Sequence, residues 1–327
     1  MKATARAFAN IALSKYWGKS DVKLNLPAVP SLSVTLEPLR TTTTVELDPK
    51  LDRDVLSLDG ARADAAELAR ATDLLDGLRA IARVRTRARI TSSNDFPTAA
   101  GLASSASGFA ALAGAAAAAL GLDLGPAALS AVARQASASA ARSIFGGFVE
   151  LPAGRPGHAA LAARQIAPAS HWDIRVVVAL AARGRKKVGS TGGMTHTERT
   201  SPYYDAWLAV APRLTREVKR AVLARDLARL GPALEQSALA MHACAIAARP
   251  GVVYWQPPTL EALATVRRLR DERGIAVFAT MDAGPHVKAV CLATDARRVA
   301  RALAQTPGVL GTLIARPGGP LEVEVDR

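Results

Sequence analysis

The amino-acid sequence predicts an α+β fold. Segments typical of strands occur at 41–47, 83–90 and 174–180, and segments with the apolar spacing of helices occur at 98–120, 126–141, 204–223 and 259–273. They do not alternate as regular βαβ units, which argues against a doubly wound parallel sheet. The Gly- and Lys-rich segment at 182–201 is the best candidate for a boundary. We therefore predict an N-terminal domain over 1–184 and a C-terminal domain over 185–327.

The strand predicted at 83–90 shows the clearest alternation. In RVRTRARI every second residue is an arginine, and the residues between them are smaller or apolar. This pattern is typical of a half-buried strand with one solvated, charged face.

The predicted helices carry further signals. The stretch 109–122 is almost all Ala, Gly and Leu and is too short to span a bilayer, so a buried helix is expected there. Thr259 is expected to cap the helix at 259–273 and Gly274 to end it. Its apolar stripe consists of residues three positions apart, namely Leu260, Leu263, Val266 and Leu269.

The chain of 327 residues is strongly basic, with a formal net charge of +14. Such a balance fits nucleic acid, an acidic membrane surface or polyanionic small molecules as partners. Aromatic residues make up only 4%, and no RNP-like motif or zinc-finger spacing occurs. Nucleic-acid binding is therefore kept only as an alternative of a different class. The N-terminus has no uninterrupted apolar segment, so no signal peptide is expected.

The spacing of the cysteines and histidines limits the kinds of metal site that can be expected. Cys244 and Cys291 lie far apart, and the five histidines show no HExxH or similar spacing. This argues against a disulfide scaffold or a zinc site and fits a reducing cytosol. No metal site built from protein ligands alone is predicted, and any metal is expected to be a hard, oxygen-bound ion such as Mg²⁺.

The segment SSNDFPTAAGLASSASGFAAL at 92–112 has two interpretations. It is not a Walker A motif, because no Gly-Lys-Ser/Thr triplet follows the glycine. The turn from Pro97 to Ser105 precedes a helix, whose free N–H groups and dipole favour an anion. The alternative is a tightly packed Ala/Gly helix with serine at its cap. Composition alone leaves both open.

Three further segments combine residue types suited to anionic ligands. In ANIALSKYWGKSDVKLNLPAVPSLSVTL (9–36), two lysines four apart flank an aromatic pair and can grip a diphosphate; the alternative is a solvated surface turn. RQASASAARSIFGGFVEL (134–151) contains Arg142, and arginine can bind a carboxylate through two parallel hydrogen bonds. In ATMDAGPHVKAV (279–290), an apolar strand ends at Asp282 before a Gly-Pro turn and a second strand. Alone, such an Asp is usually a structural turn residue.

Taken in order, these motifs resemble the diphosphomevalonate decarboxylases of the GHMP kinase superfamily. Residues 96–112 resemble the superfamily's phosphate-binding motif, with Thr98-Ala99-Ala100 in the form of the decarboxylase branch. The likeness runs from about residue 6 to residue 292. It implies a GHMP kinase-like fold around one deep cleft, with an N-terminal region like domain 2 of ribosomal protein S5 and a C-terminal ferredoxin-like α+β region.

The resemblance implies roles for individual residues. Asp282, Lys15 and Arg142 correspond to catalytic positions. The implied substrate-binding residues are Asn10, Tyr16, Trp17, Lys19, Ser137, Ser139, Arg142, Ser190 and Thr191. The implied ATP phosphate-binding residues are Asn94, Pro97, Thr98, Ala99, Ala100, Gly101, Leu102, Ala103, Ser104 and Ser105.

The sequence also departs from the family pattern. Ala136 and Ala138 stand where glycine is usual, Ala141 where cysteine is usual, and His286 where asparagine is usual. Alanine restricts φ, so the turn near residue 138 is expected to be narrower or differently pitched. These departures bear on the substrate more than on the reaction.

The family's reaction converts ATP and (R)-5-diphosphomevalonate into isopentenyl diphosphate, ADP, phosphate and CO₂, with ATP as co-substrate and Mg²⁺ bridging its phosphates; Ser105 is a candidate metal ligand. Three alternatives remain: a relative acting on the 5-phosphate to give isopentenyl phosphate, a mevalonate 3-kinase, and a catalytically retired binding module. The resemblance further implies a cytoplasmic homodimer that takes small-molecule substrates and neither nucleic acid nor a membrane as partner.

Overall fold

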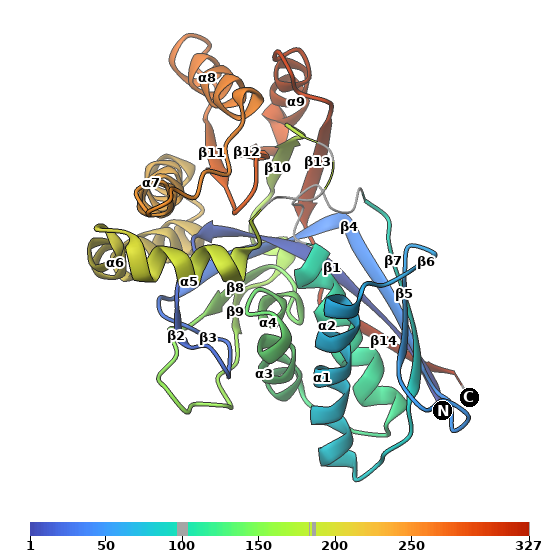
Figure 1. The fold of residues 1–327 in the computed structure, drawn as a ribbon. Coiled ribbons are helices and arrows are strands. Elements are labelled where there is room, and N and C mark those ends of the chain that lie inside the picture. The colour runs from blue at the N-terminus through green and yellow to red at the C-terminus, as the bar shows by residue number, and fades with distance from the viewer. Residues whose placement is uncertain (97–103, 183, 185–187, 327) are drawn as a thin grey trace.

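The computed structural model describes residues 1–96, 104–182, 184 and 188–326. The prediction of an α+β fold is confirmed, since the described residues contain one large mixed sheet with helices packed against it (Figure 1). The elements of the first half are β1 (Lys2–Ser14), β2 (Lys19–Asp21), β3 (Leu26–Pro27), β4 (Ser31–Leu47), β5 (Val55–Leu58), β6 (Ala61–Arg62), α1 (Ala65–Ala82), β7 (Ala88–Asn94), α2 (Ser104–Ala119), α3 (Pro126–Ala136), α4 (Ala140–Ser143), β8 (Phe148–Leu151) and β9 (Arg164–Ala167).

The second half begins with another strand of the same sheet. Its elements are β10 (Ile174–Ala179), α5 (Ser190–Thr200), α6 (Tyr204–Ala224), α7 (Leu227–Ile246), α8 (Pro257–Asp271), β11 (Val277–Met281), β12 (Val287–Leu292), α9 (Ala296–Ala304), β13 (Thr312–Pro317) and β14 (Glu322–Asp326). Short 3-10 turns lie at 169–171 and 293–295.

The large sheet joins the two halves of the chain. Its main path runs β11-β12-β10-β13-β4-β7-β5-β6, and β1 pairs with both β4 and β14. The chain ends lie side by side, because β14 runs antiparallel to β1 with Lys2 opposite Asp326 (Figure 1). Strand β10 pairs with β12 and β13, which follow the predicted boundary. The division into 1–184 and 185–327 stays a prediction.

Separate apolar clusters hold the helices to the sheet. Helices α1 to α4 pack on β1 and β7, and α8 and α9 pack on β10 to β12. Helices α6 and α7 cover the centre, where residues from the second half of β1, from β4 and from β10 share one apolar cluster. This arrangement places the end of β1 beside α7 and near the turn between β11 and β12.

Small residues let α2 approach the sheet closely. Most of its residues from Ala106 to Ala119 are buried, as expected for the stretch beginning at Phe109. A Cβ on Gly114 would lie 2.7 Å from Leu321 Cδ2 and 3.4 Å from Ala5 Cβ. Packing therefore explains the small residues of this helix from 106 onward.

The glycine pair at 146–147 also meets a spatial requirement. Gly147 has φ +72°, and a Cβ on Gly146 would lie 2.5 Å from the carbonyl carbon of Gly319. The pair lets the chain entering β8 pass against the segment that joins β13 to β14.

Two expectations about elements were wrong in part, and a third can be compared only over the described residues. The strand at 83–90 begins only at Ala88, because α1 runs to Ala82 and Arg83 caps it in the left-handed region with φ 56°. The helix at 126–141 breaks at 137–139, between α3 and α4. The described part of the helix at 98–120 is α2, which ends at Ala119, while 98–103 lie outside the described residues.

The helix expected at 259–273 is shifted by two residues. It begins at Pro257, because the two prolines that open it already have helical φ. Gln256 is therefore the N-cap. Thr259 is the third residue of the helix, and its Oγ1 accepts from the Gln256 N–H at 3.1 Å. Leu260 was wrongly placed in the apolar stripe and is 55% exposed, whereas Val266 is buried. Gly274, with φ +63°, follows the end of this helix.

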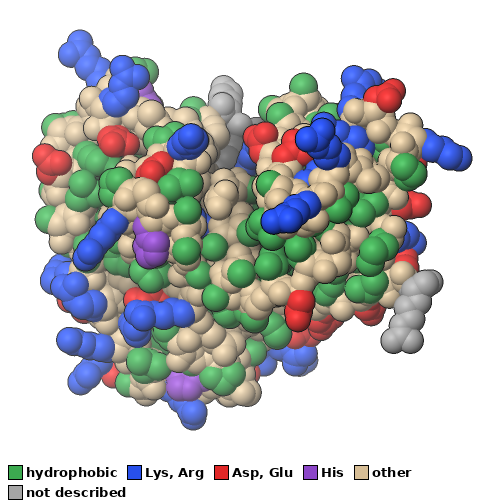
Figure 2. Space-filling model, turned by 90° about the horizontal axis from the view of Figure 1, so that it is seen from below, with side chains coloured by type: hydrophobic (Ala, Val, Ile, Leu, Met, Phe, Trp, Pro, Cys, Tyr) green, Lys and Arg blue, Asp and Glu red, His purple; other side chains and the backbone are tan. Residues whose placement is uncertain are grey.

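Charge is spread over the surface rather than gathered in one stripe on the face that Figure 2 shows. Lys and Arg side chains are interspersed there with Asp, Glu and hydrophobic side chains. Within the described ranges, no helix is both long and apolar enough to cross a bilayer.

Candidate active site

Asp282 occupies the turn between two neighbouring antiparallel strands. Strand β11 ends at Met281 and β12 begins at Val287, and these two residues are paired across the ladder. The Gly284 N–H donates to the Asp282 carbonyl at 2.7 Å and closes the turn. The side chain is 28% exposed, so it faces the protein while one side stays open.

Lys15 follows directly on β1 and reaches Asp282 from the other half of the chain. Its Nζ donates to Asp282 Oδ1 at 2.6 Å and to the Ala12 carbonyl at 2.9 Å. Its own N–H donates to Ser237 Oγ of α7 at 2.9 Å. The lysine side chain is only 1% exposed. The fold thus brings together two predicted catalytic residues separated by 267 positions.

A second lysine, which the sequence motifs did not single out, contacts the same carboxylate. Lys288 Nζ lies 3.1 Å from Asp282 Oδ2, and the lysine side chain is 0% exposed. In the sequence it is one polar position in an apolar strand, two residues after His286. The available signal was a lysine in a strand that is otherwise apolar, because such a buried charge needs a partner.

The two lysines control the ionisation of Asp282. Burial alone would raise the pKa of this carboxyl, but the charges of Lys15 and Lys288 outweigh burial and hold the pKa well below its usual value. Burial lowers the pKa of Lys15 to about 8, although the charge of Asp282 partly opposes that shift. Asp282 is therefore an ionised carboxylate and a weak base at neutral pH.

Arg142 provides a third buried cation. Helix α4 carries it, and it donates from Nη1 to Ser31 Oγ at 2.8 Å and from Nε to Ser33 Oγ at 3.0 Å. Burial lowers the pKa of this guanidinium to about 10, so it stays charged at neutral pH. Within the described part of the chain it forms no ion pair with an acidic side chain. A buried arginine with only hydroxyl and amide partners is suited to a ligand carboxylate.

Asn10 connects this arginine to the turn before α4. Its Oδ1 lies 3.4 Å from Arg142 Nε, and its Nδ2 donates to the Ser139 carbonyl at 3.0 Å and to Ser143 Oγ at 2.8 Å. Asn10 therefore fixes the position of Arg142 relative to Ser139 and Ser143.

Ser137 and Ser139 lie in the break between α3 and α4, with their hydroxyl oxygens 3.0 Å apart. The alanines that depart from the family pattern are accommodated there by packing. Ala138 and Ala141 are buried in an apolar cluster with Leu26. The extra methyl group of Ala138 thus contributes to the core beneath the serines, where Ala141 also packs.

Lys19 and Arg70 form a cationic pair near this break. Burial lowers the pKa of Lys19, and the charge of Arg70 lowers it further, which indicates that the two cations are close. Arg70 Nη2 also donates to the Ala136 carbonyl at 2.9 Å, just before Ser137. Arg70 lies on α1, outside every motif, and sequence reasoning missed it.

The two aromatic residues of the first motif differ in burial, because Trp17 lies in an apolar cluster and Tyr16 packs against it only partly buried. Trp17 is 1% exposed and packs edge-on against Tyr254 at 6.1 Å between ring centroids. Burial raises the pKa of Tyr16, whose hydroxyl is buried without a hydrogen-bond partner among the described residues.

The predicted nucleotide-binding residues are described only in part. Asn94 ends β7 and accepts from Thr41 Oγ1 at 2.6 Å, and Ser104 and Ser105 open α2. Ser190 and Thr191 open α5. The remaining predicted residues of the phosphate loop lie outside the described residues: Pro97, Thr98, Ala99, Ala100, Gly101, Leu102 and Ala103.

Two buried histidines flank the site without carrying charge. Burial lowers the pKa of His286 to about 4 and that of His242 to about 3. His286 Nδ1 accepts from the Ala181 N–H at 3.0 Å and so joins the start of β12 to the end of β10. His242 packs on Trp255 at 5.0 Å between rings, as expected for a buried helix face.

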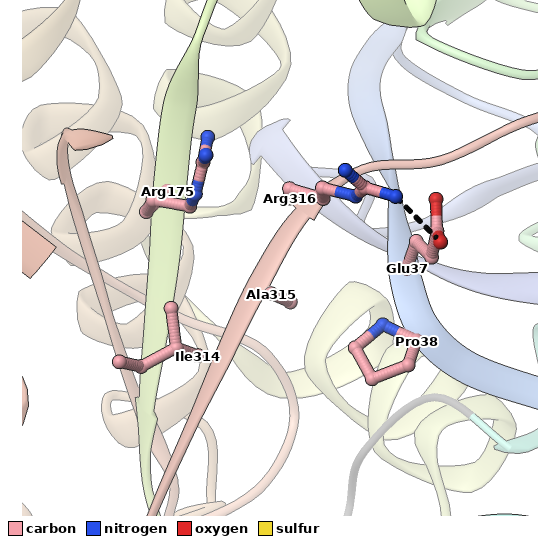
Figure 3. Close-up of a pocket in the computed structure, with 6 residues that line it drawn as sticks. All are labelled: Glu37, Pro38, Arg175, Ile314, Ala315 and Arg316. Atoms are coloured by element: carbon pink, nitrogen blue, oxygen red, sulfur yellow. Dashed lines mark hydrogen bonds and ion pairs between the residues drawn. The ribbon is translucent and has the colours of Figure 1, made fainter.

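Two surface hollows lie apart from these residues. One, of about 260 Å³, is lined by Glu37, Pro38 and Arg175 with residues 314–316 of β13, and includes the ion pair between Arg316 and Glu37 (Figure 3). The other lies at the end of α1 among arginines 79, 83, 85 and 87. Among the described residues, no cluster of three acidic, histidine or cysteine side chains is suited to hold a metal ion.

Both halves of the chain match known families. Residues 7–162 match the family described as diphosphomevalonate decarboxylase-like N-terminal domain, and residues 176–309 match the mevalonate 5-diphosphate decarboxylase C-terminal domain. Diphosphomevalonate decarboxylase mvd1 of Aspergillus fumigatus is 37% identical over 318 residues, covering 91% of this chain and 79% of its own. The human diphosphomevalonate decarboxylase is 36% identical, covering 86% and 75%.

Solved structures agree with these relatives. The mevalonate diphosphate decarboxylase of Staphylococcus aureus is 35% identical with a TM-score of 0.93, covering 99% of this chain and 98% of its own. A further structure, described as MDDEF in complex with MVAPP, AMPPCP and magnesium, is 38% identical with a TM-score of 0.92 and covers 99% of both chains. The matches span nearly the whole chain, and this protein therefore belongs to the diphosphomevalonate decarboxylase family.

Proposed function

We propose that this chain catalyses the ATP-dependent decarboxylation of (R)-5-diphosphomevalonate to isopentenyl diphosphate, ADP, phosphate and CO₂, through phosphorylation of the C3 hydroxyl. The observation that carries the proposal is the buried pair of Lys15 and Asp282 close to Arg142, a guanidinium with no acidic partner among the described residues. The relative described in complex with MVAPP, AMPPCP and magnesium supports the choice of substrates.

The chemistry explains why these residue types are needed. A 3-hydroxy acid has no carbonyl group β to its carboxylate that could accept electrons when CO₂ leaves. Phosphorylation turns the C3 hydroxyl into a leaving group. When the C3–O bond breaks, its electron pair leaves with phosphate, the C1–C2 bond pair forms the C2–C3 double bond, and C1 departs as CO₂.

The cations and Asp282 divide this work. Asp282 orients the C3 hydroxyl and accepts its proton, and because its carboxyl is a weak base, positioning contributes more than basicity. Lys15 neutralises charge on the transferring phosphoryl group while it holds Asp282. Arg142 holds the C1 carboxylate, and its hydrogen bonds to Ser31 and Ser33 fix the orientation of the guanidinium.

The cationic pair of Lys19 and Arg70 supports the 5-diphosphate over the 5-phosphate. Arg70 touches the backbone immediately before Ser137, and the hydroxyls of Ser137 and Ser139 face each other in the break. Two cations beside two hydroxyl groups match the larger negative charge of a diphosphate better than that of a single phosphate.

The described residues are compatible with a nucleotide whose metal is held mainly by phosphate oxygens. Ser105 lies exposed in the first turn of α2 and is a candidate oxygen ligand for Mg²⁺, and no carboxylate cluster competes with it in the described part of the chain. Bound Mg²⁺ would neutralise phosphate charge. Asn94, Ser104 and the loop at 97–103 would hold the ATP phosphates, and Ser190 and Thr191 would contact substrate phosphate.

The test is an end-point assay with purified protein, ATP and Mg²⁺. Mevalonate, its 5-phosphate and its 5-diphosphate are compared, and ADP, phosphate and CO₂ are measured separately. Equal amounts of all three products from the 5-diphosphate alone are expected. The same result from the 5-phosphate would move the assignment to that substrate, and ADP without CO₂ would identify a 3-kinase. No turnover would contradict the proposal.

A further inference from the structure

We propose that Lys288 is a positioning residue for the candidate base. It holds Asp282 Oδ2 while Lys15 holds Oδ1, so that the carboxylate keeps one orientation when Lys15 engages the transferring phosphoryl group. This inference rests on the proposed function for its kinetic consequences, whereas its geometric basis is independent of the substrate.

The strand that carries Lys288 is fixed on both sides. Within β12, Lys288 is opposite Val178 of β10 and Thr280 of β11. Its side chain is 0% exposed and its Nζ lies 3.1 Å from Asp282 Oδ2. A lysine anchored between two paired strands cannot follow a moving ligand, but it provides a fixed point for the turn that follows β11.

The two lysines are bonded differently, which separates their roles. Lys15 Nζ already donates to Asp282 and to the Ala12 carbonyl, and an ammonium group has a third proton for a ligand. For Lys288, the partner found among the described residues is Asp282 alone. When Lys15 shares its charge with a phosphoryl group, Lys288 remains to hold the carboxylate.

Fold stability does not account for this second lysine. One ammonium group balances one carboxylate, and Lys15 already provides it at 2.6 Å. A further buried cation carries a desolvation cost that an apolar side chain of the same length would avoid. A residue that costs stability at a reaction centre is better explained by function.

Among the groups around Asp282, the lysines are the main influence on its pKa. Lys15 approaches from the end of β1, Lys288 from β12, Arg142 from α4 and His242 from α7, and His286 lies on the same turn. Both histidines are neutral near pH 7 because burial lowers their pKa values. Removing Lys288 therefore raises the pKa of Asp282, since a nearby cation shifts a carboxyl by about 1–3 pH units.

The experiment compares wild type with Lys288→Met, which keeps the chain length and removes the charge, and with Lys288→Arg, which keeps the charge. Lys219→Met is the control, because Lys219 Nζ lies 2.9 Å from Glu150 Oε2, in an ion pair that includes neither Asp282 nor Lys15, and Glu150 keeps a second cationic partner in Arg164. The measurements are kcat and KM from pH 3 to pH 9, the thermal midpoint, and the ¹³C shift of the Asp282 carboxyl from pH 2 to pH 8 in aspartate-labelled protein, assigned with Asp282→Asn.

For Lys288→Met we expect kcat to fall about 100-fold, as a misplaced reacting group produces, with smaller changes in KM. The acid limb of the pH profile and the Asp282 carboxyl titration should both move to higher pH, while the thermal midpoint stays the same or rises. Lys288→Arg should retain the wild-type acid limb, and Lys219→Met should match wild type in kcat and in the Asp282 titration.

Wild-type kcat in Lys288→Met would overturn the inference, as would a lower kcat with an unchanged Asp282 titration. If Lys288→Met does not fold, Lys288→Gln provides the same comparison, and a shifted acid limb in Lys288→Arg would also count against it. An inactive wild type would instead contradict the proposed function, and the carboxyl titration would still test the contact between Lys288 and Asp282.

Discussion

At the scale of single residues, the site contains more buried cations than carboxylates. Lys15, Lys288 and Arg142 surround the lone carboxylate of Asp282 among the described residues, which leaves the buried site net positive before any ligand binds. A buried excess of cations is costly in an empty site. The same excess favours substrates that bring a carboxylate and phosphates.

The first residue-scale prediction concerns Asp282→Ala. Loss of the group that orients the C3 hydroxyl and accepts its proton should lower kcat by about 10²–10⁴-fold, with a much smaller rise in KM. Steady-state kinetics against both substrates measure this. Asp271→Ala is the control, because that side chain is 64% exposed on α8. Equal changes in kcat and KM would argue for a binding role instead.

The second concerns the alkaline side of the pH profile. Burial lowers the pKa of Lys15 to about 8, so Lys15 is charged below that pH and loses its proton above it. Activity that needs the ammonium should therefore decline above about pH 8 in kcat/KM, which reports the free enzyme. Lys15→Arg should move this limb to higher pH, because arginine stays charged. A limb at the same pH in that variant would assign it to another group.

At the scale of elements, His286 joins two strands that support the site. It stands at the start of β12 and accepts from the Ala181 N–H just beyond β10. An asparagine side-chain oxygen can accept the same hydrogen bond but cannot be protonated in this range. The departure from the family pattern thus places a titratable group at a position that accepts a backbone hydrogen bond.

This difference predicts how stability depends on pH. The pKa of His286 is about 4 in the folded protein and 6.5 in the unfolded chain. Below pH 6.5 the unfolded chain therefore binds a proton more readily than the folded protein, and the free energy of unfolding decreases as the pH falls. Between pH 7 and pH 5, wild type should lose about 2 kcal/mol more of its free energy of unfolding than His286→Asn. Urea unfolding at both pH values measures this. Parallel losses in the two proteins would contradict it.

At the scale of the whole molecule, one sheet connects the halves that supply the site. Lys15 directly follows β1, Arg142 lies on α4, and Asp282 lies in the turn after β11. Figure 1 shows these three elements. The return of β14 to β1 is reinforced by the ion pair between Lys2 and Asp326 at 2.6 Å. Since this pair is half exposed, we assign it little stability.

The net charge of +14 leads to a prediction about substrate capture. A basic protein attracts polyanionic substrates over distances comparable with the Debye length, which is about 10 Å at 0.1 M salt. We expect kcat/KM for the anionic substrates to fall as salt rises from about 0.01 M to about 0.3 M, because the Debye length shortens from about 30 Å to less than about 8 Å. The value of kcat at saturation should change little. The measurement is initial rates across potassium chloride concentrations. An unchanged kcat/KM would show that surface charge does not steer the substrates.

Local sequence determined the α+β class, the family and the identity of Lys15, Arg142 and Asp282 as candidates. Each motif combines a turn with a particular side chain, and both are encoded by neighbouring residues, as in the Asp282 turn before Gly-Pro. The stretch at 83–90 shows the limit of such reasoning. Alternation predicted a strand from residue 83, but α1 and its cap at Arg83 occupy the space where that strand would begin.

Only the tertiary structure decided which charges meet and how deeply they are buried. In the sequence, Lys288 is marked only by its position in an otherwise apolar strand. Its proposed role follows from the 3.1 Å distance to Asp282 and from its complete burial. The approach of Lys19 on β2 to Arg70 on α1 is likewise a tertiary feature, and the break at 137–139 places two serines within a segment predicted to be helical. Distances between residues far apart in sequence, and the burial that shifts their pKa values, depend on packing between elements, which no local pattern encodes.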